Sequence, residues 1–174
     1  MAKVKGKAKL NKAISAQLEP FGIKKAQLTD EYAYYFDDER VTYKITENES
    51  GDEWFKEFVA ERFGFNVKYP FVFSLLHEVG HHKTEDDVDG SLYDFCIEEK
   101  ERIHNEMQTA DKEYSKVLEW QYFNLPDEII ATAWAVRYCR KHPRKVKKMW
   151  TEMLIALQAF YIANGLLEEE QGLW

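Results

Sequence analysis

The sequence predicts an α+β fold that is mainly helical, with a small antiparallel β-hairpin or sheet placed before a central helix. Apolar residues recur at helical spacing through most of the chain, and one short stretch instead reads as two strands joined by a turn. The chain has 174 residues, of which 45% are hydrophobic, and this is enough for one core. We therefore expect a single domain over residues 1–174, in which residues 1–12 could form a flexible basic N-terminus.

The first elements are a helix, a hairpin and a second helix. A helix is predicted over residues 8–18, because three leucine or isoleucine side chains recur four residues apart. These are Leu10, Ile14 and Leu18. Residues 32–46 predict a β-hairpin, since two aromatic or β-branched runs flank a charged turn. A turn at residues 48–51 and a helix at 53–63 should follow.

The second half of the chain is predicted to be helical. A helix over residues 70–82 begins with a proline, which the first turn of a helix tolerates. A long polar helical stretch is expected from about residue 91 to 120, and a further helix from 126 to about 141. Pro143 opens the last helix, and its apolar stripe ends at residues 164–165, an Asn-Gly pair typical of a helix C-terminus.

Residues 77–81 read His-Glu-Val-Gly-His and contain candidate metal-binding residues. On an α-helix, positions i and i+4 share a face, so His77 and His81 can hold one metal ion. Glu78 is turned off that face but can reach a water molecule on the ion. Gly80 costs about 1 kcal/mol in a helix interior. Close approach of another backbone segment would explain the glycine, and so would an early helix end.

The same helix has a separate apolar face. Its members are Val72, Leu75, Leu76 and Val79. The histidines lie on another face, so we expect the ligand face to be distinct from the main core face. The alternative to a metal site is an exposed, charged helix turn, which the apolar residues before the motif disfavour.

A catalytic metal site of this type needs a third protein ligand and one position for water. Glu128 is the best candidate, in the first turn of the next predicted helix. It shares a face with Ala131 and Thr132, whose small side chains would allow close packing against the histidine helix. Two alternatives stay open. Glu128 could have no role other than a favourable interaction with the helix dipole, and Asp127 could be the ligand instead.

Other candidate ligands are weaker. His82 is rotated by about 100° from its neighbour in the motif and cannot easily join the same ion. His104 lies on a polar helical segment and is expected at the surface, and His142 has no partner at ligand spacing. The acidic residues at 86–89 lack the full pattern of a calcium loop, so we expect a solvated turn there.

The motif H-E-V-G-H, followed by a helix that reads E-x-x-A-x-x-W-A, resembles the gluzincin-like metallopeptidases of the ImmA/IrrE type. It is also similar to small zincin-like proteins of phages and mobile elements. The resemblance covers roughly residues 30–140. It implies that His77, His81 and Glu128 bind zinc and that Glu78 is the catalytic base. The 46 residues between His81 and Glu128 are more than is usual for the family.

These observations predict a peptidase with Zn²⁺ as its cofactor and a protein or peptide as its substrate, regulatory and narrow in specificity. An edge strand of the hairpin at 32–46 could hold the substrate in extended form. A further group should stabilise the oxyanion, and four side chains could supply it: Tyr93, His104, Tyr114 and Tyr122. The alternatives are a non-catalytic zinc-binding protein and a phage or mobile-element interaction protein.

Composition and charge set the remaining expectations. The net charge is −7, yet residues 137–148 and the N-terminus are basic. Specific nucleic-acid binding is not expected, because cations in the last turn of a helix offset its dipole and no nucleic-acid motif accompanies them. No apolar run reaches the ~18 residues of a membrane span. Cys96 and Cys139 have no metal or disulfide spacing. We therefore expect a cytoplasmic protein without membrane contact, of undetermined oligomeric state.

Overall fold

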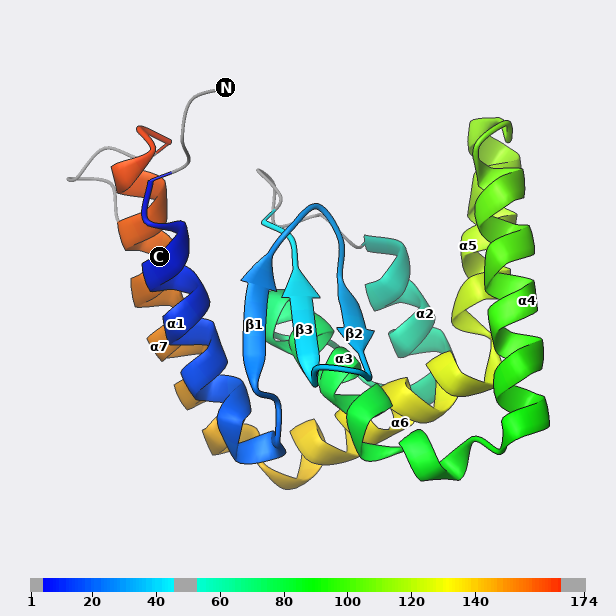
Figure 1. Ribbon diagram of the computed structural model, residues 1–174, viewed down its shortest axis with the longest axis horizontal. Coiled ribbons are helices and arrows are strands. Elements are labelled where there is room, and N and C mark those ends of the chain that lie inside the picture. The colour runs from blue at the N-terminus through cyan, green and yellow to red at the C-terminus, as the bar shows by residue number, and fades with distance from the viewer. Residues whose placement is uncertain (1–4, 46–52, 167–174) are drawn as a thin grey trace. The chain divides into compact units, whose positions relative to one another are not determined.

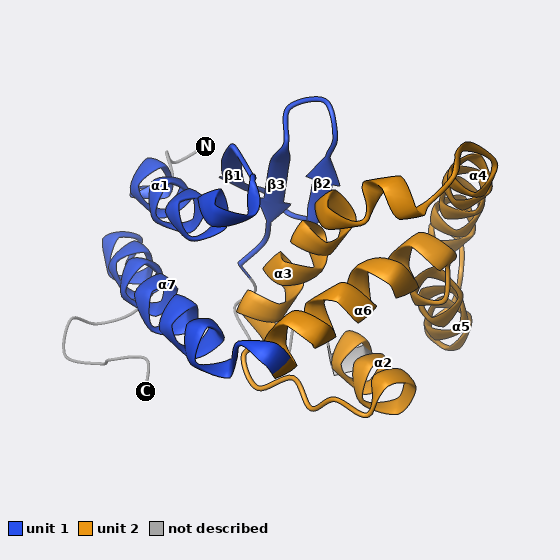
Figure 2. Cartoon of the chain, turned by 90° about the horizontal axis from the view of Figure 1, so that it is seen from below, with its two compact units in different colours: residues 1–45, 141–174 blue, residues 46–140 orange. Residues whose placement is uncertain are grey.

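The fold is α+β and mainly helical, with one three-stranded sheet (Figure 1). The computed structural model describes residues 5–45 and 53–166, so the predicted turn at 48–51 lies outside the described residues. The chain divides into two compact units, residues 1–45 with 141–174 and residues 46–140 (Figure 2). Within the described ranges, no helix combines the length and the apolar character needed to cross a membrane.

The first unit pairs α1 (Lys7–Leu18) with α7 (Pro143–Ala163). The three predicted apolar residues of α1 are buried, and α7 ends at Asn164 as expected. The Asn164 Nδ2 group donates to the carbonyl of Lys5 at 2.9 Å, so the start of α1 lies against the end of α7. The two helices are therefore antiparallel. Residues 7–12, for which flexibility was predicted, belong to α1 because Leu10 packs into the core.

A mixed sheet follows α1 and the short 3-10 helix η1 (Glu19–Phe21). Its strands are β1 (Lys25–Leu28), β2 (Ala33–Tyr35) and β3 (Arg40–Tyr43), in the order β1-β3-β2. The predicted hairpin is confirmed: β2 and β3 are antiparallel, with Tyr34 opposite Val41. The strand β1 was not predicted. It runs parallel to β3, which makes the sheet mixed.

Side chains of α1 hold β1 in place. The N–H of Ala26 donates to Ser15 Oγ at 2.8 Å, and the N–H of Leu28 donates to Asn11 Oδ1 at 2.9 Å. The Tyr43 hydroxyl donates to the same Asn11 oxygen at 2.6 Å. These bonds occupy the outer edge of β1. An extended peptide that adds to this sheet would therefore do so along β2.

The second unit is helical. Its elements are α2 (Glu53–Phe63), α3 (Pro70–Lys83), the 3-10 helix η2 (Glu85–Asp87), α4 (Gly90–Met107), α5 (Lys112–Phe123) and α6 (Pro126–Lys141). The predictions for α2, α3 and α6 are confirmed to within about a residue at each end. The polar stretch predicted from about residue 91 to 120 is helical, but it consists of two helices. The first ends at Met107, and Asp111 caps the second by accepting a hydrogen bond from the N–H of Tyr114 at 2.8 Å.

Burial on α3 and α6 differs from the prediction. The residues of α3 from Val72 to Gly80 are buried on every side of the helix, so its ligand face is as deep as its apolar face. On α6, the apolar residues that recur at helical spacing and would be expected to form the core face are only half-buried. They are Ile130, Ala133, Trp134 and Tyr138. The buried face of α6 is instead the one that carries Glu128 and its small neighbours. Packing against α3 therefore outweighs side-chain hydrophobicity in orienting α6.

Candidate metal centre

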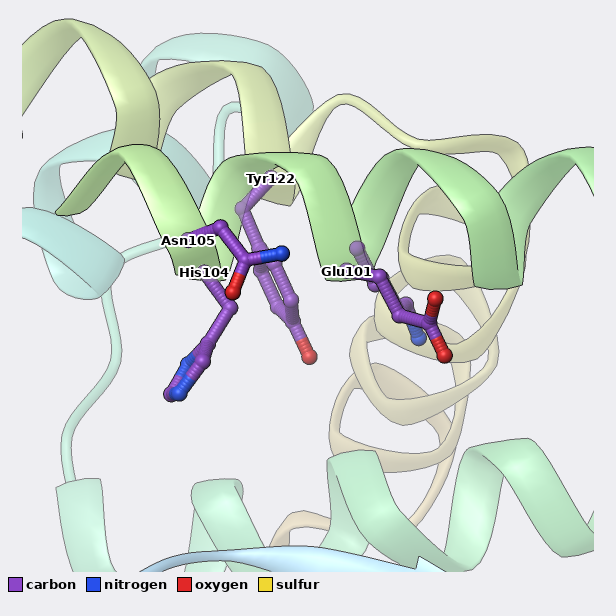
Figure 3. Close-up of a pocket in the computed structure, with 5 residues that line it drawn as sticks. Glu101, His104, Asn105 and Tyr122 are labelled. Atoms are coloured by element: carbon purple, nitrogen blue, oxygen red, sulfur yellow. The ribbon is translucent and has the colours of Figure 1, made fainter. Parts of the chain in front are cut away.

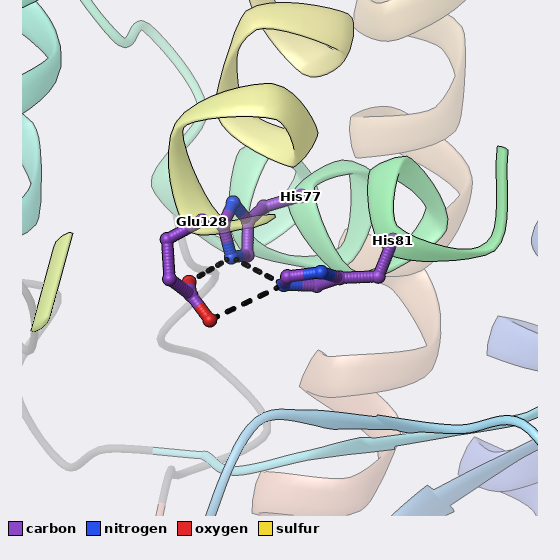
Figure 4. A group of neighbouring side chains, drawn as sticks. All are labelled: His77, His81 and Glu128. Carbon is purple, nitrogen blue, oxygen red and sulfur yellow. Dashed lines mark hydrogen bonds and ion pairs between the residues drawn. The ribbon is translucent and has the colours of Figure 1, made fainter. Parts of the chain in front are cut away.

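Three side chains converge where α3 meets α6: His77, His81 and Glu128 (Figure 4). The Nε2 atom of His77 lies 2.9 Å from Glu128 Oε2 and 3.2 Å from His81 Nε2. The Nε2 atom of His81 lies 3.5 Å from Glu128 Oε1. Among the described residues, this is the group of His, Cys, Asp and Glu side chains that could hold a metal ion.

The donor set fits a divalent cation. Two imidazole nitrogens and a carboxylate oxygen all direct lone pairs toward one point, which is unfavourable unless protons or a cation lie among them. Ligands of a tetrahedral zinc site are separated by about 3.3 Å, since the bonds to nitrogen and oxygen are about 2.0–2.2 Å long. The two separations from His77 Nε2, 2.9 Å to Glu128 Oε2 and 3.2 Å to His81 Nε2, lie close to that value. The buried group can therefore hold a metal ion.

Close packing of two backbones makes this convergence possible. Gly80, between the two histidines, lies directly against Ala131 of α6. A Cβ atom at Gly80 would come within 2.9 Å of the Ala131 Cα and closer still to its carbonyl oxygen. The explanation of Gly80 as a point of backbone approach is confirmed. Because α3 and α6 lie this close, the side chain of Glu128, one turn before Ala131, can reach the histidines.

Two further contacts fix the His77 ring, one at its Nδ1 atom and one with an aromatic side chain. Its Nδ1 atom lies 3.0 Å from Thr132 Oγ1, one turn beyond Glu128 on α6. The ring of Phe55, on α2, packs edge-on against the imidazole with a centroid separation of 5.2 Å. When Nδ1–H donates a hydrogen bond to the Thr132 hydroxyl, Nε2 is unprotonated and its lone pair can bind a metal ion. Thr132 was predicted only as a small packing residue, and its hydroxyl has this second role.

We predict that Thr132→Val weakens metal binding by about 10- to 100-fold, because the substitution keeps the side-chain shape but removes the oxygen that orients His77. Titration of the metal-free protein with zinc against a chromophoric chelator measures the change. Thr132→Ser keeps the hydroxyl and serves as the control, with affinity close to that of the wild type. Equal affinities for the Val and Ser variants would show that the hydroxyl does not orient the ring.

A lysine completes the surroundings of Glu128. Lys100 Nζ, from α4, lies 2.5 Å from Glu128 Oε1 and 2.5 Å from Asp127 Oδ2. Burial by itself raises the pKa of the Glu128 carboxyl, but the charges of His81 and Lys100 outweigh burial and hold that pKa well below its ordinary value. Glu128 is therefore ionised, as a metal ligand must be. The alternative ligand, Asp127, is held by Lys100 and lies outside the converging group.

A pocket opens beside this network (Figure 3). Its volume is about 430 Å³, and it is lined by Lys100, Glu101, His104, Asn105 and Tyr122. Burial raises the pKa of the Tyr122 hydroxyl, and the negative charges of Glu128 and Glu78 add to that effect. Tyr122 therefore lies within the electrostatic field of the centre and also faces the pocket. Glu78 itself is buried, with 6% of its surface exposed.

The other sequence candidates lie outside the centre. His104 is exposed on α4, as predicted, although it lines the pocket. His82 is not part of the converging group, and His142 is the N-cap of α7. The acidic stretch at 85–87 is the exposed helix η2. Sequence reasoning missed Lys100 and Phe55, because neither is near the motif and neither belongs to a recognisable pattern.

The chain matches no protein-family model, no curated protein and no solved structure. The function of the centre must therefore be argued from the residues that form it.

Proposed function

We propose that this protein is a zinc-dependent peptidase of the zincin type, similar to the ImmA/IrrE metallopeptidases. One observation supports this above all others: two histidines one helical turn apart and a glutamate from a second helix lie within hydrogen-bonding distance of one another, with Glu78 buried beside the first histidine. Two imidazoles and one carboxylate are the protein ligands of a catalytic zinc that keeps an open position.

The roles of the protein groups follow from their chemistry. Zinc, when bound, lowers the pKa of a coordinated water to about 7 and polarises a carbonyl oxygen. Glu78 accepts a proton from the attacking water and returns it to the amine that leaves. Thr132 holds the His77 ring in the tautomer that presents Nε2, and Phe55 excludes water from its face.

Tyr122 is the best of the four predicted oxyanion donors. Its hydroxyl carries a proton at neutral pH, burial raises its pKa further, and it lines the pocket next to Lys100. Tyr114 is exposed and donates to Glu106 Oε2 at 2.6 Å, and Tyr93 is 39% exposed. His104 shares the pocket but is exposed. Tyr122 would donate its hydroxyl hydrogen to the oxygen that gains negative charge in the reaction.

The pocket also indicates the kind of substrate. It is open enough to admit one side chain of an extended peptide, and the Tyr122 ring offers an apolar wall. The polar groups of Glu101 and Asn105 at its rim would select among peptides. A pocket with mixed walls fits a peptidase of narrow, regulatory specificity rather than a general degradative one.

The test is Glu78→Gln in the zinc-loaded protein. We expect zinc content and thermal stability to stay close to wild type, while cleavage falls by about 10²- to 10⁴-fold because the proton acceptor is lost. Products from a proteome-derived peptide library, identified by mass spectrometry, measure the cleavage. Glu57→Gln, an exposed glutamate on α2, makes the same chemical change away from the motif and should leave cleavage unchanged.

Three outcomes would overturn the proposal. Absence of zinc from the purified protein after zinc loading would remove the metal centre. Zinc binding without any cleavage by the wild type would leave a non-catalytic zinc-binding protein. Preferential binding of Fe²⁺ would point to oxygen chemistry, because two histidines and one carboxylate also form the facial triad of non-haem iron enzymes.

A further inference from the structure

Lys100 is bound to the same carboxylate as the metal centre. Its ammonium group lies 2.5 Å from Glu128 Oε1 and 2.5 Å from Asp127 Oδ2, and 23% of its side chain is exposed. The Tyr122 ring lies 5.3 Å from the same nitrogen and shields it further. An ammonium group that contacts two carboxylates is held in its charged form. Lys100 is therefore a fixed positive charge.

Both oxygens of Glu128 face the histidines, and one of them also binds Lys100. Oε1 accepts the ammonium of Lys100 and lies 3.5 Å from His81 Nε2, whereas Oε2 lies 2.9 Å from His77 Nε2. A metal ion bound to Glu128 would therefore share that carboxylate with a protein cation. Lys100 neutralises part of the negative charge that attracts the ion and repels the ion directly.

We propose that Lys100 is a tethered competitor of the metal ion: it holds the Glu128 carboxylate in position, keeps the metal-free site stable and lowers the affinity for the ion. This inference rests on the metal centre of the proposed function and not on peptide cleavage. At a given free concentration of the ion, Lys100 therefore lowers the fraction of the centre that is occupied.

The charge balance at the site supports the proposal that Lys100 lowers the affinity for the metal ion. The described acidic groups at the site are Asp127, Glu128 and Glu78, and all three are buried. Without Lys100, the metal-free site would lose the ammonium group that contacts both Asp127 and Glu128. A divalent ion would then relieve more repulsion on binding, so its affinity would rise as the stability of the metal-free form falls.

Lys100 and Thr132 should act in opposite directions. Thr132 receives a hydrogen bond from a ligand, and such partners make the ligand a better donor to the ion. Lys100 instead donates to a ligand and withdraws negative charge from it. Loss of Thr132 should weaken metal binding, whereas loss of Lys100 should tighten it. A residue that only stabilised the fold would not tighten binding when removed.

The experiment is a zinc titration of Lys100→Met by competition with a chromophoric chelator, together with thermal unfolding of the metal-free and zinc-loaded protein. We expect zinc affinity to rise by about tenfold or more, because a nearby charge is removed from a buried site. The metal-free variant should unfold at a lower temperature than the wild type, and the zinc-induced rise in Tm should be larger. Lys100→Gln removes the charge but keeps a donor, and should also bind zinc more tightly.

The controls separate this inference from the proposed function. Lys100→Arg keeps the charge and should not bind zinc more tightly than the wild type. Lys112→Met removes an exposed lysine from the start of α5 and should leave the affinity unchanged. Unchanged or weaker zinc binding by both Lys100→Met and Lys100→Gln overturns the inference while the metal centre stands. A wild-type protein that binds no divalent ion overturns both.

Discussion

Replacing Gly80 by alanine is expected to lower the free energy of unfolding and the metal affinity together. The added methyl group would meet the backbone of Ala131 at 2.9 Å or less, and backbone cannot move aside as a side chain can. Such overpacking costs about 3 kcal/mol. The higher helix propensity of alanine returns about 1 kcal/mol, so the net loss is about 2 kcal/mol. Urea unfolding of the metal-free protein measures it.

Zinc affinity tests the contact between α3 and α6 more specifically than the free energy of unfolding does. Glu128 reaches the histidines only because α3 and α6 lie close, so separating the helices should weaken zinc binding by about tenfold or more, as for other changes that misplace a ligand. Gly90→Ala is the matched control, since a Cβ atom at Gly90 meets nothing within 4 Å. That variant should lose neither stability nor affinity. Wild-type zinc affinity in Gly80→Ala would contradict this view of the helix contact.

Local patterns predicted the parts of the centre that are local in the sequence. The i, i+4 spacing places His77 and His81 on one face whatever surrounds the helix. The energetic penalty of Gly80 allowed two explanations, a nearby backbone or an early helix end, and the contact with Ala131 decides for the first. The centre was therefore predictable as a set of ligands, because each ligand lies on a helix with strong start signals.

Features that depend on tertiary contacts were not predictable in this way. β1 is only four residues long and has no β-branched or aromatic side chain. It is a strand because it pairs with β3 and because Asn11 and Ser15 bind its amides. Lys100 sits in a helix rich in charged residues, where one lysine resembles any other. Its position against Glu128 depends on how α4 folds back through α5. Sequence spacing does not predict a contact between Lys100 and Glu128, because the two residues meet only after α4 and α5 have folded against each other.

Replacing Glu128 by glutamine should have the largest effect on the centre. The carboxylate is 3% exposed and contacts Lys100 and His77, so its neutralisation removes one of the two carboxylates that balance the ammonium of Lys100. Breaking a buried ion pair from one side costs about 3 kcal/mol. Zinc binding should also be lost. The difference in unfolding free energy between wild type and variant should therefore increase by about 2.7 kcal/mol when free zinc is 100 times the Kd of the wild type. Glu152→Gln, at an exposed ion pair of α7, should leave both quantities unchanged.

The pH dependence of the same comparison identifies the charge as the cause. The pKa of Glu128 is held well below that of an unfolded glutamate, which is about 4.3. A carboxyl with a lowered pKa contributes stability that is fully present above the unfolded value and is lost as the pH falls through the folded value. In the presence of a chelator, the difference in unfolding free energy between wild type and Glu128→Gln should be present at about pH 5 and shrink on acidification below it. A difference that does not change from neutral pH down to acid would mean that packing, and not the ionised carboxylate, is what the substitution removes.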